Sequence, residues 1–312
     1  MAKPNRATLL FYYDSKMANP NGDPTTNLPR MIDDTCFVTS NRLKRTIRDH
    51  LRHNMKEAIY IVPEYKKDGF QKTPEELGKA WLKKKGKKLE VNKKGFLDHF
   101  IDLRLFGLMY VIPNLVNPFK FVGPVQFGFG ESLNKVEPIT VEITRIVTVG
   151  KEKAGGAMGE HTVLKYAFIE FLGTINPAAI IEENNITEED VEKMLKGLWL
   201  GTNGLKTTSK DQASRLLLKI NVKDDILLSD LDHVNTLVGE KKDEKLRTIN
   251  DVVLDVEKSF NQFETFASSI NSIEYMAHPL LVCRYKENTG NFNDIINDWA
   301  SNANITIKQL NL

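Results

Sequence analysis

Apolar and polar residues follow each other along this chain with two different periods, which predict strands in some stretches and helices in others. Apolar runs bounded by turn-forming residues predict strands that are buried in a sheet. Where only every second residue is apolar, one face of the strand is expected to be buried. Strands are predicted at residues 7–14, 119–132, 138–149, 162–173 and 214–222. In the third of these, the apolar face consists of Ile139, Val141 and Ile143.

A four-residue period predicts a helix over residues 40–54, with Ser40 or Asn41 as its N-cap. Its apolar stripe consists of Leu43, Ile47, Leu51 and Met55. A cationic stripe lies about 100° further around the helix axis and consists of Lys44, Arg48 and Arg52, with Arg45 beside them. We therefore expect a helix that buries one stripe and presents positive charge next to it.

A second helix is predicted where "ITEEDVEKMLKGLWLG" begins with a capping box. Thr187 is the expected N-cap, and Asp190 takes the place of the usual Glu or Gln of the box. The ordered elements then run strand, helix, strand, strand, helix, strand. This is the order of an α+β, ferredoxin-like fold. RNA-recognition (RRM-like) domains share that order, but their aromatic signature is missing from this chain.

Composition limits the class of protein and its location. The chain has 312 residues, 41% of them hydrophobic, which is enough for one large domain. No apolar run approaches the roughly 18 residues of a membrane span, and the N-terminal apolar stretch is too short for a secretory signal. Cys36 and Cys283 have no ligand spacing, so we expect reduced thiols, a cytoplasmic protein and no membrane partner.

Charge is distributed unevenly along the chain. Residues 66–95 contain eleven lysines and four acidic residues, whereas residues 221–312 contain nine basic and fifteen acidic residues. A cationic region and an anionic end suit a polyanion on one face, and also head-to-tail self-association. The simpler interpretation is a set of solvated surfaces. The lysine-rich stretch is expected to be an insertion that is partly mobile.

The loop "NPNGDPTTNLPR" comes shortly before the cationic helix. Its three prolines fix φ and lower the entropy of the free loop. Asn19 and Asn21 offer amide donors and acceptors, and the N-terminus of the helix adds backbone N–H groups that suit phosphate. The loop and the helix therefore form a candidate phosphate cradle, although a tight surface turn beside an ordinary helix would have the same pattern.

Five motifs in order carry a resemblance to a known family: "NPNGDP", "SNRLKRTIRD", "DLRLFG", "GPVQ" and "INPAAIIEENNITEEDVEKMLKGLW". Together, over about Leu9 to Val222, they resemble the backbone subunit (Cas-seven family) of type I CRISPR surveillance complexes (Cascade), most closely subtype I-B, the Csh-two family. The resemblance implies a ferredoxin-like palm with insertions that form fingers and a thumb hairpin. Several copies would polymerise as a filament along one guide RNA, without catalysis.

The resemblance also implies partners and a domain plan. The expected partners are CRISPR guide RNA, further copies of this chain, the large, small and cap subunits, the guide-processing endonuclease and target DNA. One domain is expected over residues 1–312, with a lysine-rich insertion at about 60–98 and the thumb at about 148–162. The lysine-rich insertion is expected to contact target DNA rather than guide. A scaffold for many guides must bind the backbone, because the bases must stay free to pair.

The residues expected to bind RNA come from the loop, the helix, the glycine-rich strand and the thumb. In the strand, Gly123 would let RNA approach closely and Gln126 would reach a phosphate or sugar. In the thumb, relatives often have Met-Gly-Arg-Lys-His, whereas this chain has "AMGEH" with Glu160 in place of the basic pair. The full set is Asn19, Asn21, Ser40, Asn41, Arg42, Lys44, Arg45, Arg48, Gly123, Gln126, Ser132, Met158 and His161.

Two further motifs have alternative interpretations. In "DLRLFG", Leu103, Leu105 and Phe106 are expected in the core, and Asp102 and Arg104 are expected to pair with each other. Asp33 and Asp34 allow a metal-dependent ribonuclease as the alternative function, because paired carboxylates can hold a divalent ion. The six histidines are scattered, so no metal site and no cofactor are expected. A monomeric RNA-recognition module is the remaining alternative.

Overall fold

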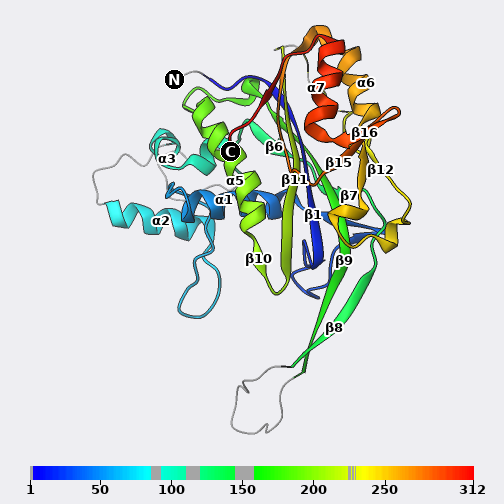
Figure 1. The fold of residues 1–312 in the computed structure, drawn as a ribbon. Helices are drawn as coiled ribbons and strands as arrows, with labels where there is room; N and C mark the ends of the chain where they lie inside the picture. Colours follow the sequence, from blue (N-terminus) through cyan, green and yellow to red (C-terminus); the bar gives the residue numbers. More distant parts are fainter. Residues whose placement is uncertain are drawn as a thin grey trace.

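A long, mostly antiparallel sheet organises the molecule (Figure 1). The computed structural model describes residues 3–85, 93–109, 120–144, 158–223, 226, 228 and 230–312. The sheet has the strand order β17-β14-β11-β1-β9-β7-β3-β2. Its long members are β1 (Ala7–Ala18), β9 (Met158–Ile175), β11 (Lys210–Val222) and β14 (Ile270–Ala277). Its short members are β2 (Met31–Ile32), β3 (Thr35–Val38), β6 (Val125–Phe127), β7 (Gly130–Ser132), β8 (Pro138–Thr144), β10 (Lys206–Thr207) and β17 (Ile307–Gln309).

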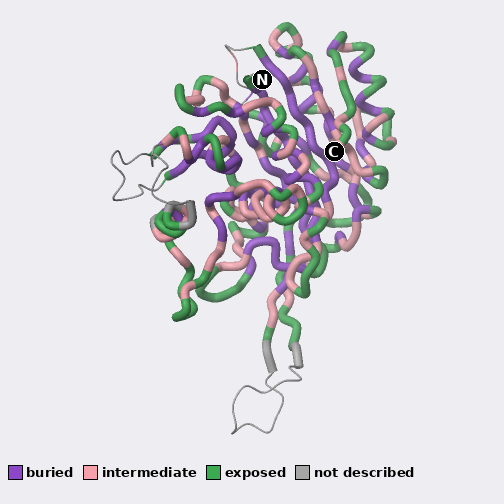
Figure 2. The backbone as a smooth tube through the Cα atoms, turned by 90° about the vertical axis from the view of Figure 1, so that its left-hand side faces the viewer, coloured by how far each residue is buried: buried purple, intermediate pink, exposed green. Residues whose placement is uncertain are grey.

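Both faces of the central strands are buried, as Figure 2 shows. In β1, Leu9, Phe11 and Tyr13 belong to one hydrophobic core, while Leu10 and Tyr12 belong to another. Successive side chains of a strand point to opposite faces, so an apolar run rather than an alternating one is what such a strand requires. The prediction of a buried strand at the start of the chain is confirmed, and the strand extends four residues further.

Two helices cover one face of the sheet, and they pack closely on each other. They are α1 (Ser40–His53) and α5 (Glu188–Gly204). A Cβ added to Gly201 would lie 3.0 Å from the backbone oxygen of Thr46, so a larger residue would require a small shift of the two helices. The capping box of α5 is confirmed. The expected cap of α1 is wrong: Thr39 accepts from the Arg42 N–H, because Thr39 is the last extended residue and Ser40 is already helical.

The other face of the sheet is covered by the C-terminal part of the chain, which the sequence patterns did not predict. It contains a second sheet of order β12-β13-β15-β16 and two helices. Their bounds are β12 (Thr236–Val238), β13 (Val253–Asp255), β15 (Val282–Tyr285), β16 (Asn288–Asn291), α6 (Glu257–Thr265) and α7 (Phe292–Ala303). Trp299 and Phe260 anchor this layer, with ring centroids 4.4 Å apart. The aromatic side chains Tyr12, Tyr166 and Phe168 lie beneath it and are at most 2% exposed.

The segment between α1 and β6 forms a small helical unit with its own core. It contains α2 (Pro74–Lys85), α3 (Lys93–His99), α4 (Ile101–Phe106), β4 (Gly107–Leu108) and β5 (Phe121–Val122). Trp81 packs on Phe96 and Phe100, with ring centroids 4.8 and 5.2 Å away. The lysine-rich insertion is therefore helical in part, and residues 86–92 lie outside the described part of the chain.

A hairpin of β8 and β9 projects from the sheet (Figures 1 and 2). The predicted burial of one face of β8 is wrong, because Val141 is 39% exposed and Ile139 is only half-buried. Among the described residues, β8 packs mainly on β9, so the apolar side chains of β8 have no core to face. Residues 145–157, which include most of the expected thumb, lie outside the described part.

Within the described residues, none of the helices has the length and apolar character that a membrane span requires. Short 3-10 helices complete the fold at Pro177–Ala179, Asp243–Lys245, Ile249–Asp251 and Ala267–Ser269.

Candidate nucleic-acid interface

A groove of about 280 Å³ runs along the N-terminal half of α1. Four residues that the sequence analysis expected to bind RNA line it together, and the insertion forms its opposite wall. Its lining includes Asn41, Lys44, Arg45, Arg48, Phe106 and Gly107. The sequence prediction that these four α1 side chains share one site is confirmed in its geometry, while their contact with RNA stays a prediction.

The helix presents these residues because of its register on the sheet. Leu43 and Ile47 are buried, so Asn41 and Arg45 point away from the sheet, and Lys44 and Arg48 point sideways toward α4. The first turn of α1 contains no acidic residue, whereas that of α5 contains three. The positive end of the α1 dipole is thus not neutralised by its own side chains, which favours an anion there.

Lys44 is the most desolvated cation of the groove. Its Nζ donates to Oε1 of Gln126 at 2.9 Å and lies 5.3 Å from the centre of the Phe106 ring. Burial, followed by repulsion from Arg48, lowers the pKa of Lys44 to about 8. Gln126 is held in turn by the Gly123 carbonyl oxygen, which accepts from its Nε2 at 2.9 Å. Gln126 therefore positions Lys44, a role that differs from the direct contact with RNA expected for it.

Arg48 is tied to the interior by an ion pair. Its Nε donates to Oδ2 of Asp102 at 2.9 Å, and Asp102 is fully buried. Asp102 also accepts from the backbone N–H groups of Tyr60 and Ile61. The expected pair between Asp102 and Arg104 is wrong, because these neighbours on α4 point to different sides of the short helix.

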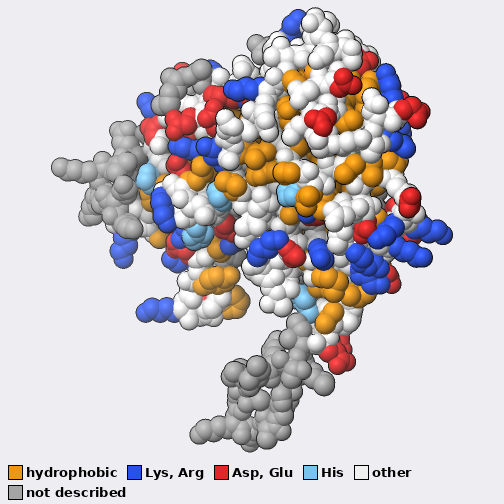
Figure 3. Space-filling view, in the orientation of Figure 1, with side chains coloured by type: hydrophobic (Ala, Val, Ile, Leu, Met, Phe, Trp, Pro, Cys, Tyr) orange, Lys and Arg blue, Asp and Glu red, His pale blue; other side chains and the backbone are white. Residues whose placement is uncertain are grey.

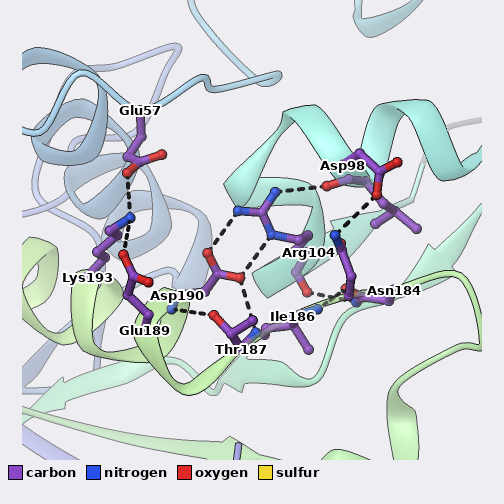
Figure 4. A network of polar contacts seen from close by, with 11 residues as sticks. Glu57, Asp98, Arg104, Asn184, Ile186, Thr187, Glu189, Asp190 and Lys193 are labelled. Atoms are coloured by element: carbon purple, nitrogen blue, oxygen red, sulfur yellow. Dashed lines mark hydrogen bonds and ion pairs between the residues drawn. The ribbon is translucent and has the colours of Figure 1, made fainter. Parts of the chain in front are cut away.

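Arg104 instead joins α4 to the beginning of α5 (Figure 4). Its Nε and Nη2 donate to the two carboxylate oxygens of Asp190 at 2.9 and 2.8 Å. Its backbone oxygen accepts from Asn184 at 2.9 Å. Asp190 thus both caps α5 and fixes α4, which carries Phe106 into the groove. The expected core positions of Leu103, Leu105 and Phe106 are confirmed.

Packing within the protein explains why position 123 is a glycine. A Cβ added to it would lie 2.4 Å from the backbone nitrogen of Gly107 and 2.4 Å from the backbone oxygen of Leu105. Gly107 has a φ of 80°, which also favours glycine. The close approach expected between Gly123 and RNA is therefore an approach between two segments of this chain, at the end of the groove.

The side chains of Asn19 and Asn21, in the loop before α1, are buried in the protein. Asn19 is 2% and Asn21 is 6% exposed, and the Asn19 side chain donates to the Asn27 backbone oxygen at 2.9 Å. Asp23 accepts from the backbone N–H groups of Thr25 and Thr26, which closes the turn. Both side chains are buried in this conformation, and their expected contact with RNA stays a prediction.

The remaining expected contacts divide into accessible and buried positions. Ser40 and Arg42 are half-buried and Asn41 is exposed. Ser132 is 2% exposed, accepts from the Cys36 N–H and donates to the Asn134 oxygen, so its hydroxyl is used inside the protein, and its contact with RNA stays a prediction. In the hairpin, Met158 pairs with Thr144 and His161 with Val141 along the β8–β9 ladder. The side chain of Met158 lies outside what the structure describes.

The two aspartates of the alternative ribonuclease function lie in the turn between β2 and β3. Asp34 is exposed and forms an ion pair with Lys135, whose Nζ is 2.8 Å away. Asp33 has a φ of 48°, which fits a tight turn. Within the described residues, no cluster of three or more His, Cys, Asp or Glu side chains could hold a metal ion.

Lys210 is a cation of this region that sequence analysis missed. It opens β11, donates from Nζ to the backbone oxygen of Asn19, and lies close enough to Arg42 for their charges to repel. Burial, followed by that repulsion, lowers the pKa of Lys210 to about 8. A single lysine before an apolar strand gives no pattern from which this position could be found.

Figure 3 shows lysine and arginine side chains both on the side of α1 and α2 and on the opposite side, beside β8. On that opposite side, three lysines form ion pairs with acidic side chains. Lys135 pairs with Asp34, Lys165 with Glu137 and Lys241 with Asp251. The N-terminal half of α1 is therefore the better candidate interface, because Lys44 and Arg42 form no ion pair among the described residues.

Comparisons of this chain with a family model and with a curated protein agree on one family. A family model described as CRISPR-associated protein Cas7 matches residues 5–257. A CRISPR-associated protein Cas7 from Haloferax volcanii is 29% identical over 302 residues, which covers 86% of each chain.

Two solved chains share the fold. One, from a CRISPR RNA-guided surveillance complex described as pre-nicking, has a TM-score of 0.52 at 13% identity and covers 95% of this chain and 100% of its own. Another, from a CRISPR RNA-guided surveillance complex, has a TM-score of 0.51 at 14% identity and covers 96% of this chain and 99% of its own. Because the family model spans most of its length, this chain belongs to the CRISPR-associated Cas7 family.

Proposed function

We propose that this protein is a backbone subunit that binds CRISPR guide RNA by its phosphates and polymerises along it. The observation that carries the proposal is the groove on α1, where Asn41, Lys44, Arg45 and Arg48 line one surface. Phosphate contacts fix the register of a nucleic acid without reading its sequence. Membership of the Cas7 family supports RNA as the ligand.

The finer assignments within this function are also proposals. The order β11-β1-β9-β7, with α1 and α5 on one face, supports a ferredoxin-like (RRM-like) palm. The insertion at about 60–98 would form fingers and the β8–β9 hairpin the thumb of a single domain. We assign the chain to type I-B and the Csh-two-like group on its motifs alone.

We further propose that the subunit is a scaffold without catalytic activity. Its partners would be guide RNA, other copies of itself, the large, small and cap subunits, the guide-processing endonuclease and target DNA. The ion pair of Asp34 with Lys135 gives this carboxylate a structural use, which favours the scaffold over the ribonuclease. Cleavage of single-stranded RNA in the presence of manganese would favour the ribonuclease.

The test is the binding of the full chain to a fluorescently labelled single-stranded RNA over a range of salt concentrations. The double variant Lys44→Met, Arg45→Gln should weaken binding and flatten its salt dependence. Each phosphate that loses its cation reduces the slope of log K against log salt by about 0.7. Arg48 is left intact because its removal would leave a buried carboxylate unpaired.

Arg52→Gln is the matched control, since Arg52 lies on α1 beyond the groove. It should bind RNA with nearly the slope of the unmodified chain. Binding that is insensitive to salt, or a double variant that binds like the control, would contradict the proposed interface.

A further inference from the structure

The two flanks of α1 differ in which cations they carry. Positions 42 and 44 are separated by about 200° around the helix axis, so Arg42 and Lys44 lie on opposite sides of the exposed Asn41. Lys44 faces α4 and the groove. Arg42 lies on the other flank, where Thr46, one turn on, accepts from its Nη2 at 3.3 Å and packs against Gly201 of α5.

On this second flank, Arg42 and Lys210 lie close enough for their charges to repel each other. Neither forms an ion pair among the described residues, and the Nε of Arg42 is buried with no partner there. The acidic side chains close to them are already used, since Asp49 pairs with Arg45 and Asp211 with Lys206. Burial is the main cause that lowers the pKa of both cations, and the charge of Arg42 adds to the effect on Lys210.

Four well-buried cations of this protein have an acidic partner, whereas Lys44 in the groove has only the neutral Gln126 as a hydrogen-bond partner among the described residues. Arg48 pairs with Asp102, Arg104 with Asp190, Arg215 with Asp14, and Lys219 with Glu188. Taking a charge out of water is unfavourable unless an opposite charge compensates for it. The pair of Arg42 and Lys210 therefore lacks one anion, while both residues remain half-exposed and accessible to a ligand.

The surroundings of this pair indicate which anion fits. Lys210 donates to the backbone oxygen of Asn19, and the Asn19 N–H donates to Ser209 at 2.9 Å, so the loop is fixed against the β10–β11 turn. The first turn of α1, with no acidic residue, begins beside it. A phosphate is the anion that such a helix end and two cations bind well.

We propose that Arg42 and Lys210 together bind one phosphate of the nucleic acid. The strand then crosses the N-terminal turn of α1, from Lys210 and Arg42 over Asn41 and Arg45 to the groove at Lys44. This inference rests on the proposed function and adds a second anchoring point and a direction for the strand. It also gives the loop at 19–30 a purpose, since that loop holds Lys210 in place.

The experiment measures the salt dependence of binding of the full chain to a labelled single-stranded oligo(U) RNA. Lys210→Met keeps the aliphatic stem and removes the charge. It should lower the slope by about 0.7, which corresponds to roughly fivefold weaker binding at about 0.1 M salt. Lys206→Met on the same hairpin is the matched control, because Lys206 already pairs with Asp211. This control should bind like the unmodified chain.

A double variant tests whether the two cations share one phosphate. Arg42→Met and Lys210→Met should each remove about 0.7 from the slope, and the double variant should remove about the same rather than twice as much. Lys210→Arg should restore the slope. A doubled loss would mean two separate phosphates and would overturn the shared site.

Thermal unfolding of the free protein separates binding from folding. Lys210→Met should change the melting temperature little, because the loss of the Nζ hydrogen bond to Asn19 is offset by the removal of a desolvated charge that Arg42 repels. A lower melting temperature with an unchanged slope would assign Lys210 to loop stability, and a change in self-association without RNA would assign it to a protein contact. Either result overturns this inference. If the unmodified chain shows no salt-sensitive binding, the proposed function itself fails.

Discussion

At the scale of single residues, the cations of α1 do two different things. Lys44 has a neutral partner in Gln126 and keeps its charge available to a ligand. Arg48 is committed to the buried carboxylate of Asp102 and stacks over Phe106, whose ring centre is 5.1 Å from its guanidinium carbon. From the sequence alone, Lys44 and Arg48 are equivalent surface charges on one stripe of the helix. Unlike Arg48, Lys44 and Arg45 can be truncated without leaving a buried carboxylate unpaired.

Arg48→Ala should therefore destabilise the fold, in contrast to the harmless truncation that its place on the cationic stripe suggests. Removing one partner of a buried ion pair typically costs about 3–5 kcal/mol. Asp102 keeps two backbone donors, so the lower end is expected. The free energy of unfolding in urea measures this. Arg45→Ala, whose partner Asp49 is exposed, should stay within about 0.5 kcal/mol, and equal stability of the two variants would refute the interior role of Arg48.

At the scale of elements, the groove depends on a close crossing of two chain segments. The turn from α4 into β4 meets the turn from β5 into β6 at Gly107 and Gly123. The crossing places Phe106 and the Gly123 carbonyl oxygen where they contact Lys44 and Gln126. The position of the groove floor is thus set by backbone packing.

Gly123→Ala should open this crossing. The added methyl group would lie 2.4 Å from two backbone atoms, which cannot move like a flexible side chain. Overpacking costs about 1–3 kcal/mol or more, and RNA binding should weaken because Gln126 and Lys44 shift. Gly128→Ala is the control, because a Cβ added there would lie 3.7 Å from the backbone oxygen of Leu172, an ordinary van der Waals contact. Chemical denaturation and RNA titration of both variants provide the measurement, and a normally stable Gly123→Ala would show that the crossing is not tight.

At the scale of the whole molecule, both faces of the sheet are covered by other elements. Helices α1 and α5 cover one face, and α6, α7 and the second sheet cover the other (Figure 1). The aromatic side chains Tyr12, Tyr166 and Phe168 of the central strands are buried beneath the C-terminal layer. Nucleic acid is therefore left to the helical side and the projecting hairpin, an arrangement that suits a subunit in a row better than an isolated module.

Assembly on RNA tests this arrangement. Particle mass, measured by analytical ultracentrifugation with single-stranded RNAs of increasing length, should rise in steps as further copies bind. A monomeric RNA-recognition module would give independent, non-cooperative binding. As a control, Arg52→Gln should assemble normally, whereas Lys44→Met, Arg45→Gln should assemble only at higher protein concentration. A mass that stays at one copy on every RNA would contradict the filament.

Local patterns in the sequence were enough for much of the core. The apolar run of β1, the stripe of α1 and the capping box of α5 each depend on residues close together in the chain, so they could be predicted. The helical period grouped Lys44, Arg45 and Arg48 correctly, but it also included Arg52, which does not line the groove. The family resemblance could also be found from the sequence, because each of its motifs is a short continuous stretch.

Tertiary structure decided what depends on residues far apart in the chain. The pairing of Arg48 with Asp102, of Arg104 with Asp190 and of Lys210 with the Asn19 loop joins residues separated by 54, 86 and 191 positions. The burial of Asn19 and Ser132 and the exposure of Val141 depend on which distant parts of the chain pack against them. Charge and polarity can be read along a chain, but desolvation and pairing are properties of the packed molecule, because they depend on distance in space.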